Sequence, residues 1–262
     1  MSAANLLLAA LVAAPVLGGG IARAQAPTYS ADSTVNAADN RPRYLAPNAL
    51  ATVYGANLSY QIRAVAPADI VGGYLPLTLG GVRVVLAGLM VHLLYVSPTQ
   101  INFLIPNNLL PGDHDFYIDR EGLSGPRIKI HVSAAAPACF QLDASGIIAT
   151  HADGSVVTAE SPAHADEVVV LWATGLARTN PEQRPGALAT GLGPVISPLN
   201  IYVNGVLLEP ERTLYAGAAP GFAGLYQINV RLPARLGARA EVELEMGEKR
   251  SKEGLGFPSE EE

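Results

Sequence analysis

Two histidines and two aspartates between positions 151 and 166 are the residues whose types and spacing best suit metal chemistry. They form two His-Ala-Asp triplets, at His151, Asp153, His164 and Asp166. Imidazole and carboxylate groups bind zinc and similar divalent ions, so a metal-dependent hydrolase is one hypothesis. The alternative is a β-turn in which Asp153 bonds the local backbone, with His164 and Asp166 on the solvated approach to the next strand. Because no His-x-x-x-His element supports a metal, we expect the turn, and we predict no cofactor.

A second set of candidates lies in a motif that occurs twice, Gln-Ile-Asn followed by an apolar strand and a proline. Residues spaced by two point to one face of a strand, so Gln100 and Asn102, and likewise Gln227 and Asn229, share a face. With nearby aromatic rings these amides could form a polar recognition face that stacks on sugars. The rings in question are Tyr95, Trp172, Tyr215 and Tyr226. The alternative, which we favour, is that the amides satisfy neighbouring backbone groups and lock a Leu-Tyr turn to the strand.

Other catalytic patterns are missing from the sequence. No Gly-x-Ser-x-Gly elbow occurs, and Asp113 and Asp115 suit a wet strand face better than a glycosidase pair. The pair Gly80-Gly81 precedes a strand rather than a helix, so no phosphate cradle is expected. The one cysteine, Cys139, excludes an internal disulfide and is expected to be a small half-buried hydrophobe. We therefore predict a protein that is not an enzyme.

The amino-acid composition limits which classes of protein and which folds the chain can have. Hydrophobic residues make up 49% of the 262 residues, whereas charged residues make up 15% and the net charge is -6. Nucleic-acid surfaces need clustered Lys and Arg, so we expect no nucleic-acid partner. The 26 glycines and 20 prolines favour many turns between short strands.

The first residues resemble an export signal. Leu6 to Gly20 is an apolar run, and small residues follow that allow cleavage after Ala24 or Ala26, so residues 1–26 are predicted to be a signal peptide. The basic start that is usual in such signals is missing, which a misplaced start codon would explain. No later run is long enough to span a membrane. We expect a secreted or cell-surface protein with no membrane span in the mature chain.

The elements that must position these residues are short strands, because no helical spacing persists over ten residues. Strands expected at 50–54, 82–86, 90–96 and 100–105 have counterparts at 167–176, at 200–203 and in the second Gln-Ile-Asn strand, which starts at Gln227. This pattern predicts an all-β chain of two tandem Ig-like antiparallel β-sandwich domains related by an internal repeat. The expected division is an extended lead-in (27–43), domain one (44–133), domain two (134–247) and a disordered acidic tail (248–262).

Several segments resemble a known family. These are Leu-Pro-Leu-Thr-Leu-Gly-Gly-Val at 75–82, the motif at 94–103, Ala-Thr-His-Ala-Asp-Gly at 149–154, the strand at 167–176 and the second motif at 220–230. They are similar to the Solibacter C-terminal domain family of Acidobacteria over roughly residues 44–247. The resemblance implies an exported β module, often fused behind other extracellular domains, with no assigned activity. The turn at 54–58 also looks like the opening strand of Ig-like IPT/TIG domains.

Taken together, these observations favour an exported, non-catalytic structural or interaction module of the bacterial surface. The expected partner is an extracellular protein or a glycan. The alternatives that remain open are a carbohydrate-binding module and a metal-dependent hydrolase.

Overall fold

The computed structural model describes residues 25–260, and each pair of strands in this part of the chain is antiparallel. Its helical segments are two single-turn 3-10 helices, η1 (Pro67–Asp69) and η2 (Pro210–Arg212). Neither is long and apolar enough to cross a membrane. The predicted all-β antiparallel fold is therefore confirmed. The predicted signal peptide lies outside the described residues, apart from its last two positions.

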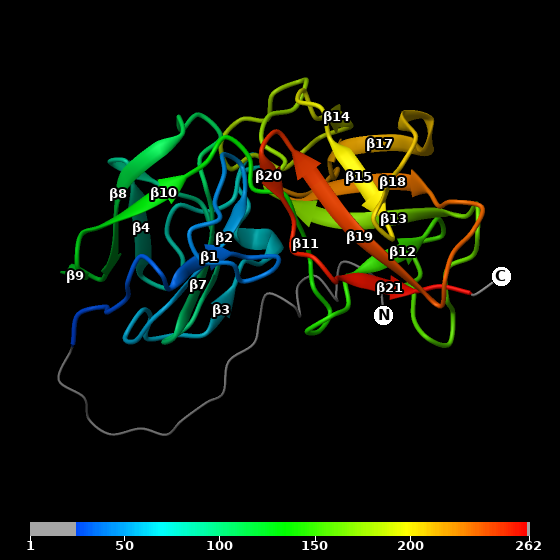
Figure 1. Cartoon of the computed structure of the whole chain (residues 1–262). Helices are drawn as coiled ribbons and strands as arrows, with labels where there is room; N and C mark the ends of the chain where they lie inside the picture. The colour runs from blue at the N-terminus through cyan, green and yellow to red at the C-terminus, as the bar shows by residue number, and fades with distance from the viewer. Residues whose placement is uncertain (1–24, 261–262) are drawn as a thin grey trace.

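Strands between residues 34 and 132 build the first sandwich, on the left of Figure 1. Their bounds are β1 (Thr34–Asn36), β2 (Leu50–Tyr54), β3 (Arg63–Ala64), β4 (Val82–Leu86), β5 (Leu89–Met90), β6 (Leu93–Val96), β7 (Gln100–Leu104), β8 (Gly112–Arg120), β9 (Leu123–Ser124) and β10 (Ile128–Val132). One sheet has the order β1-β2-β7-β6-β3 and the other β10-β8-β4-β5, with β9 paired to β8. Phe103 and Phe116 join the two sheets in one core, with ring centroids 5.6 Å apart.

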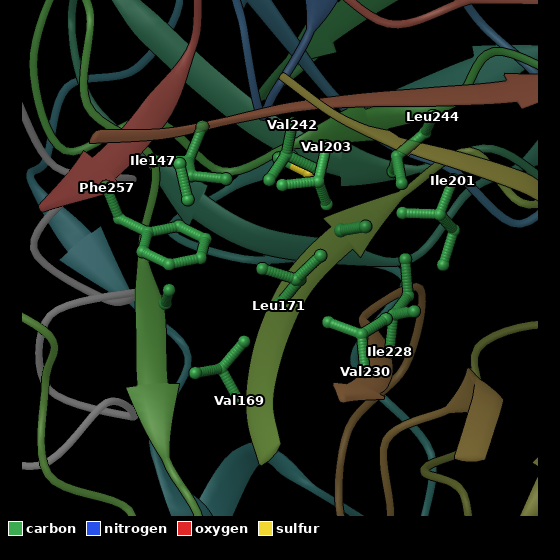
Figure 2. Close-up of a cluster of buried hydrophobic side chains, with 14 of the residues drawn as sticks. Ile147, Val169, Leu171, Ile201, Val203, Ile228, Val230, Val242, Leu244 and Phe257 are labelled. Carbon is green, nitrogen blue, oxygen red and sulfur yellow. The ribbon is translucent and has the colours of Figure 1, made fainter. Parts of the chain in front are cut away.

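The second sandwich, on the right of Figure 1, uses strands between residues 138 and 258. Their bounds are β11 (Ala138–Cys139), β12 (Ala149–His151), β13 (Val168–Thr174), β14 (Gly193–Pro194), β15 (Asn200–Val203), β16 (Val206–Leu207), β17 (Thr213–Ala218), β18 (Tyr226–Arg231), β19 (Arg239–Met246), β20 (Lys249–Arg250) and β21 (Gly256–Pro258). One sheet has the order β11-β13-β18-β17-β14, with β12 on β13, and the other β16-β15-β19-β20, with β21 on β19. Figure 2 shows Leu171 and Ile228 on one side of the core between these sheets and Val203 and Val242 on the other.

The central hairpins of the two sandwiches share their register. In β6 and β7, Tyr95 lies opposite Asn102, and the strand bulges between residues 93 and 95. In β17 and β18, Tyr215 lies opposite Asn229, and the bulge falls between residues 213 and 215. Trp172 faces the second Gln-Ile-Asn strand where Tyr54 faces the first. Each copy of the motif therefore forms a bulged hairpin of the same kind, and a third strand, β2 or β13, pairs with its second strand.

The predicted lead-in is wrong, because residues 34–36 form β1 and pair with β2. Thr34, Val35 and Asn36 are all buried. The polar members are satisfied internally: the Asn36 side chain donates to the backbone oxygens of Tyr44 and Ala136 and accepts from the Ala38 N–H. Hydrophobic periodicity cannot detect a strand buried through hydrogen bonds. The first sandwich therefore begins before residue 44.

The predicted disordered tail is also wrong. Residues 249–250 and 256–258 both pair with β19, as β20 and β21. Leu255 and Phe257 are buried in the core of the second sandwich, and Ser251 exchanges backbone and side-chain hydrogen bonds with Leu244. Two alternating apolar residues suffice to anchor this segment, although charges and glycines surround them. The second sandwich therefore extends past residue 247.

Candidate functional site

The predicted binding residues of the first motif are structural. Tyr95, Gln100 and Asn102 are at most 4% exposed. Asn102 Oδ1 accepts hydrogen bonds from Gln100 Nε2 at 2.9 Å and from the Thr52 hydroxyl at 3.0 Å. The Ser97 hydroxyl accepts from the Gln100 N–H at 2.9 Å, which closes the turn before the strand. These amides tie the turn to its neighbours and do not present a recognition surface.

The second motif is more open. Trp172 and Gln227 are opposite each other, as are Tyr215 and Asn229, and all four side chains are half-buried. Gln227 Nε2 lies 3.5 Å from Asn229 Oδ1, and Trp172 Nε1 donates to the Thr150 hydroxyl at 3.3 Å. Four of the eight predicted binding residues therefore share one partly accessible face.

Tyr226 does not belong to that face. It is fully buried, its hydroxyl donates to the Ala177 carbonyl, and it accepts from Asn48 Nδ2 at 2.9 Å. Burial raises the pKa of Tyr226 well above its usual value. Its predicted role as a stacking surface is wrong, because a buried ring offers no face to a ligand.

The predicted metal ligands do not converge, and residues 25–260 contain no cluster of three or more His, Cys, Asp or Glu side chains suited to a metal. Asp153 accepts from the Ser155 N–H at 2.8 Å, which is the expected turn. His164 contacts Glu260 at 2.9 Å, and Asp166 pairs with Arg212 at 2.9 Å. Each of the four groups is held by a different neighbour, so they form no common ligand set in the structure.

His151 instead belongs to a hydrogen-bond chain that the sequence did not reveal. Its Nδ1 lies 2.5 Å from Glu167 Oε1, and its Nε2 lies 3.3 Å from Ser161 Oγ. This is the Ser-His-Glu order of an activated nucleophile. Ser161 lies in an irregular loop with no motif around it, so only the folded chain brings the three residues together.

Two features work against acyl transfer at Ser161. Its backbone N–H is bonded to Thr158, and the next residue, Pro162, has no N–H, so neither can stabilise an oxyanion there. Partial burial lowers the pKa of His151, but hydrogen bonds to Glu167 and to the Ser161 carbonyl together outweigh it and raise that pKa. A raised pKa favours the imidazolium form, which donates from both nitrogens and cannot accept the Ser161 proton.

The two sandwiches meet along a contact that we call the seam. It contains a buried apolar cluster with members from both sandwiches: Ala38, Leu50, Leu75, Leu104, Ala138, Phe140, Ile148, Ala219, Ala223 and Leu225. Inside it the Thr174 hydroxyl accepts from the Leu50 N–H at 2.9 Å and donates to the Gly224 carbonyl at 2.7 Å. All three groups are buried, so separating the sandwiches would leave polar groups unpaired.

At one end of the seam, the loops at 72–75 and 186–188 pair across the sandwiches. The Leu75 N–H donates to Gly186 at 2.9 Å, and the Leu188 N–H donates to Gly73 at 2.8 Å. A side chain at Gly186 would meet the His92 ring at 2.1 Å, so only glycine permits this close packing. Backbone bonds therefore fix the 178–195 loop of the second sandwich to the first.

A hollow of about 500 Å³ opens beside these paired loops, and we call it the seam hollow. Its lining comes from both sandwiches and comprises residues 72–74, 181–184, 187–193 and 218. Tyr74 and Arg184 face each other, with Arg184 Nη1 3.5 Å from the Tyr74 hydroxyl. The Tyr215 hydroxyl accepts from the Gly193 N–H at 3.0 Å and donates to the Ala218 carbonyl at 2.9 Å. Tyr215, one of the predicted binding residues, therefore contacts two residues that line the seam hollow.

A second hollow of about 680 Å³ lies elsewhere along the seam and is mainly apolar. Leu110 and Ile196 are among its exposed residues. Cys139 lines neither hollow; burial raises the pKa of its thiol to about 12, so it stays an inert core residue.

Comparison with protein-family models gave no match. Comparison with curated proteins gave none either. Among solved structures, the chain is similar to the Bacteroides ovatus mixed-linkage glucan utilization locus SGBP-B in complex with a heptasaccharide, at 12% identity and a TM-score of 0.35, over 82% of this chain and 41% of that one. It is also similar to SGBP-B from a xyloglucan utilization locus of Bacteroides uniformis (10% identity, TM-score 0.29, 90% and 50% covered) and to the titin I9-I11 tandem (11%, 0.26, 90% and 64%). The chain thus spans about two fifths of the first of these proteins, and similarities this low carry no argument about ligand or activity.

Proposed function

We propose that the chain is a non-catalytic extracellular structural or interaction module in which the two sandwiches act as one rigid body. The seam carries this proposal, because it buries apolar side chains and a hydroxyl-centred network between the sandwiches. Domain contacts that are small and polar permit relative motion, whereas this one has an apolar cluster and a buried hydrogen-bond network at Thr174. A rigid pair of sandwiches suits a protein that presents surfaces at fixed distances.

The arrangement around His151 supports a non-catalytic role. Its Ser-His-Glu order resembles a catalytic triad, but the backbone at Ser161 offers no oxyanion donor, and the hydrogen bonds of His151 favour its imidazolium form. Glu167 also accepts from the His164 N–H at 2.8 Å, so these hydrogen bonds hold the loop whose Ala163 N–H donates to Pro258 at the end of β21. Its geometry serves to fix a loop.

The test is to measure turnover and cooperativity on the purified chain. We expect no hydrolysis of p-nitrophenyl acetate or of p-nitrophenyl glycosides above buffer, and a single calorimetric unfolding transition. Ester turnover that Ser161→Ala abolishes would overturn the non-catalytic assignment. Two separate transitions would overturn the rigid-body assignment.

A carbohydrate-binding role is the second candidate, and the seam hollow favours it. Sugar sites combine an aromatic ring with a few polar groups in an open concave surface. The hollow offers the ring of Tyr74, the guanidinium of Arg184 and backbone groups of a glycine-rich loop. This moves the expected sugar surface from the motif strands, whose first copy is buried, to the junction between the sandwiches.

A further inference from the structure

The seam hollow is lined by two charged side chains, Glu182 and Arg184. Glu182 lines it but is held by Arg178 in a two-pronged ion pair, with distances of 3.0 and 2.7 Å. Arg184 has no carboxylate within ion-pair distance among residues 25–260, and its guanidinium is exposed. In a chain with a net charge of -6, the hollow therefore presents an unpaired cation. A guanidinium binds carboxylates with two parallel hydrogen bonds, so this cation favours a ligand with a carboxylate.

Tyr74 supplies a preorganised ring beside that cation. Residues 74 and 187 form an isolated antiparallel bridge, so the backbone of Tyr74 is fixed to the opposite sandwich. An added Cβ at Gly73 or at Gly191 would have no atom within 4 Å, so the hollow is open at these two glycines. A ring held in place next to open space stacks on a sugar at little entropic cost.

The strands near the hollow do not favour a peptide added to a sheet edge. The nearest edge strand is β14, and Pro194 in it has no N–H to donate. Its outer side is already occupied, because the Asn180 N–H donates to the Pro194 carbonyl at 2.8 Å and the Ile196 N–H donates to Arg178 at 3.0 Å. Strand addition needs a free row of backbone groups, which the hollow does not offer.

We propose that the seam hollow binds an acidic oligosaccharide, with a uronate carboxylate on Arg184 and the adjoining sugar ring on Tyr74. This inference rests on the carbohydrate-binding candidate and adds the class of sugar. Tyr215 acts as a positioning residue, because its hydroxyl fixes the Gly193 backbone in the wall. Binding is expected to weaken as salt is added, since the contact with Arg184 lies at the surface.

The experiment is calorimetric titration of the full chain with a short oligogalacturonate and with its neutral galactose counterpart. We expect the acidic oligomer to bind and the neutral one to bind at least about tenfold more weakly. Arg184→Gln should abolish that preference, and Tyr74→Ala should weaken the binding of both. Tyr74→Phe keeps the ring and should retain most of the affinity.

Two further variants test whether binding takes place in the seam hollow and does not depend on positive charge elsewhere on the surface. Arg235→Gln removes an exposed arginine beyond the other end of β18 and should leave the titration unchanged. Gly191→Leu needs no positive φ and adds bulk at the lining, so it should reduce binding without unfolding the chain.

The outcomes also distinguish this inference from the function on which it rests. Equal affinity for the acidic and neutral oligomers, affinity unchanged in Arg184→Gln, or no binding of the acidic oligomer would each overturn the acidic-sugar assignment. Binding of neutral glycans that survives Tyr74→Ala and Gly191→Leu would keep a carbohydrate-binding module but place its site elsewhere.

Discussion

The two copies of the bulged hairpin differ at the residue that faces the motif asparagine from the strand on its other side, β2 in the first copy and β13 in the second. In the first copy, the residue opposite Asn102 is Thr52, whose hydroxyl donates to the amide oxygen, and the whole group is buried. In the second copy, the residue opposite Asn229 is Val170, which has no hydroxyl to donate. The Gln-Asn contact there is longer, 3.5 Å against 2.9 Å, and half-exposed. The buried polar network thus includes a hydroxyl from the facing strand, and the partly open one does not.

The copies also differ in the loop that closes the hairpin. Residues 97–99 make a tight turn in the first copy, whereas residues 219–225 form a longer loop in the second. Ala219, Ala223 and Leu225 of that loop are buried in the seam. The hairpin loop is thus a short local turn in the first sandwich, whereas in the second it forms part of the contact between the sandwiches.

The largest effect is expected at Gly224 in this loop. Its φ is +72°, and an added Cβ would approach Leu104 to 2.4 Å and Leu50 to 3.0 Å. Gly224→Ala should therefore combine a left-handed backbone penalty of about 1–2 kcal/mol with overpacking of about 1–3 kcal/mol. Urea unfolding should show a total loss of about 3 kcal/mol.

Gly221 is the matched control for Gly224. It lies in the same loop with φ +85°, but nothing lies within 4 Å of an added Cβ. Gly221→Ala should therefore lose only the backbone part, about 1–2 kcal/mol. Equal losses in the two variants would mean that the loop is not pressed against the first sandwich.

The next largest difference in unfolding free energy is expected between variants that remove the motif asparagine from one copy or the other. Asn102→Ala leaves the buried Thr52 hydroxyl and the Gln100 amide without their shared acceptor, which costs about 1–3 kcal/mol. Asn229→Ala removes a half-exposed group and should cost about 0.5 kcal/mol. The free energy of unfolding in urea measures both. A larger loss of unfolding free energy for Asn229→Ala than for Asn102→Ala would contradict the view that the first copy holds the more strongly buried network.

Exchanging the cross-strand partner tests the cause directly. Thr52→Val should give the first copy the environment of the second and cost about 1 kcal/mol, because one hydrogen bond to Asn102 is lost. Val170→Thr offers a hydroxyl to Asn229 at a half-exposed position and should change stability by no more than about 0.5 kcal/mol. Equilibrium unfolding of the two single variants provides the comparison. If Thr52→Val leaves the free energy of unfolding unchanged, the Thr52 hydroxyl does not stabilise the buried polar network of the first copy.

Sequence reasoning could predict the parts of this fold that depend on periodicity. The short, continuous apolar run in β13 and the Asn204-Gly205 turn between β15 and β16 indicate a strand and a hairpin, and the structure has both. The repeated Gln-Ile-Asn motif likewise forms a strand in each sandwich, which Tyr54 faces in the first and Trp172 in the second. Local pattern and local structure agree in these segments.

The rest depends on contacts between distant residues, which periodicity does not encode. Asn36 is buried because it bonds the Ala136 carbonyl, and Arg184 faces Tyr74 only because two loops pair across the seam. The Ser161 and Glu167 contacts of His151 likewise need the folded loop. No spacing rule connects such residues, so the seam hollow and the histidine chain appear only in the structure.

The smallest effect, and the only one that depends on pH, is expected from the histidines of the two sandwiches. His151 has a raised pKa in the folded chain, against a usual value of 6.5, because its bonds to Glu167 and the Ser161 carbonyl outweigh the opposing effect of partial burial. A raised folded pKa contributes stability that is complete below the unfolded value and is lost as pH rises through the folded value. His151→Gln should therefore lower the Tm more at about pH 5.5 than at about pH 8.5. His131 of the first sandwich pairs with Asp113, but both side chains are more than half exposed, so solvent screens the pair and His131→Gln should cost no more than about 0.5 kcal/mol. A Tm difference for His151→Gln that grows toward alkaline pH would show that the imidazole is held neutral, and the Ser161 hydroxyl would then have the base that the folded loop otherwise denies it.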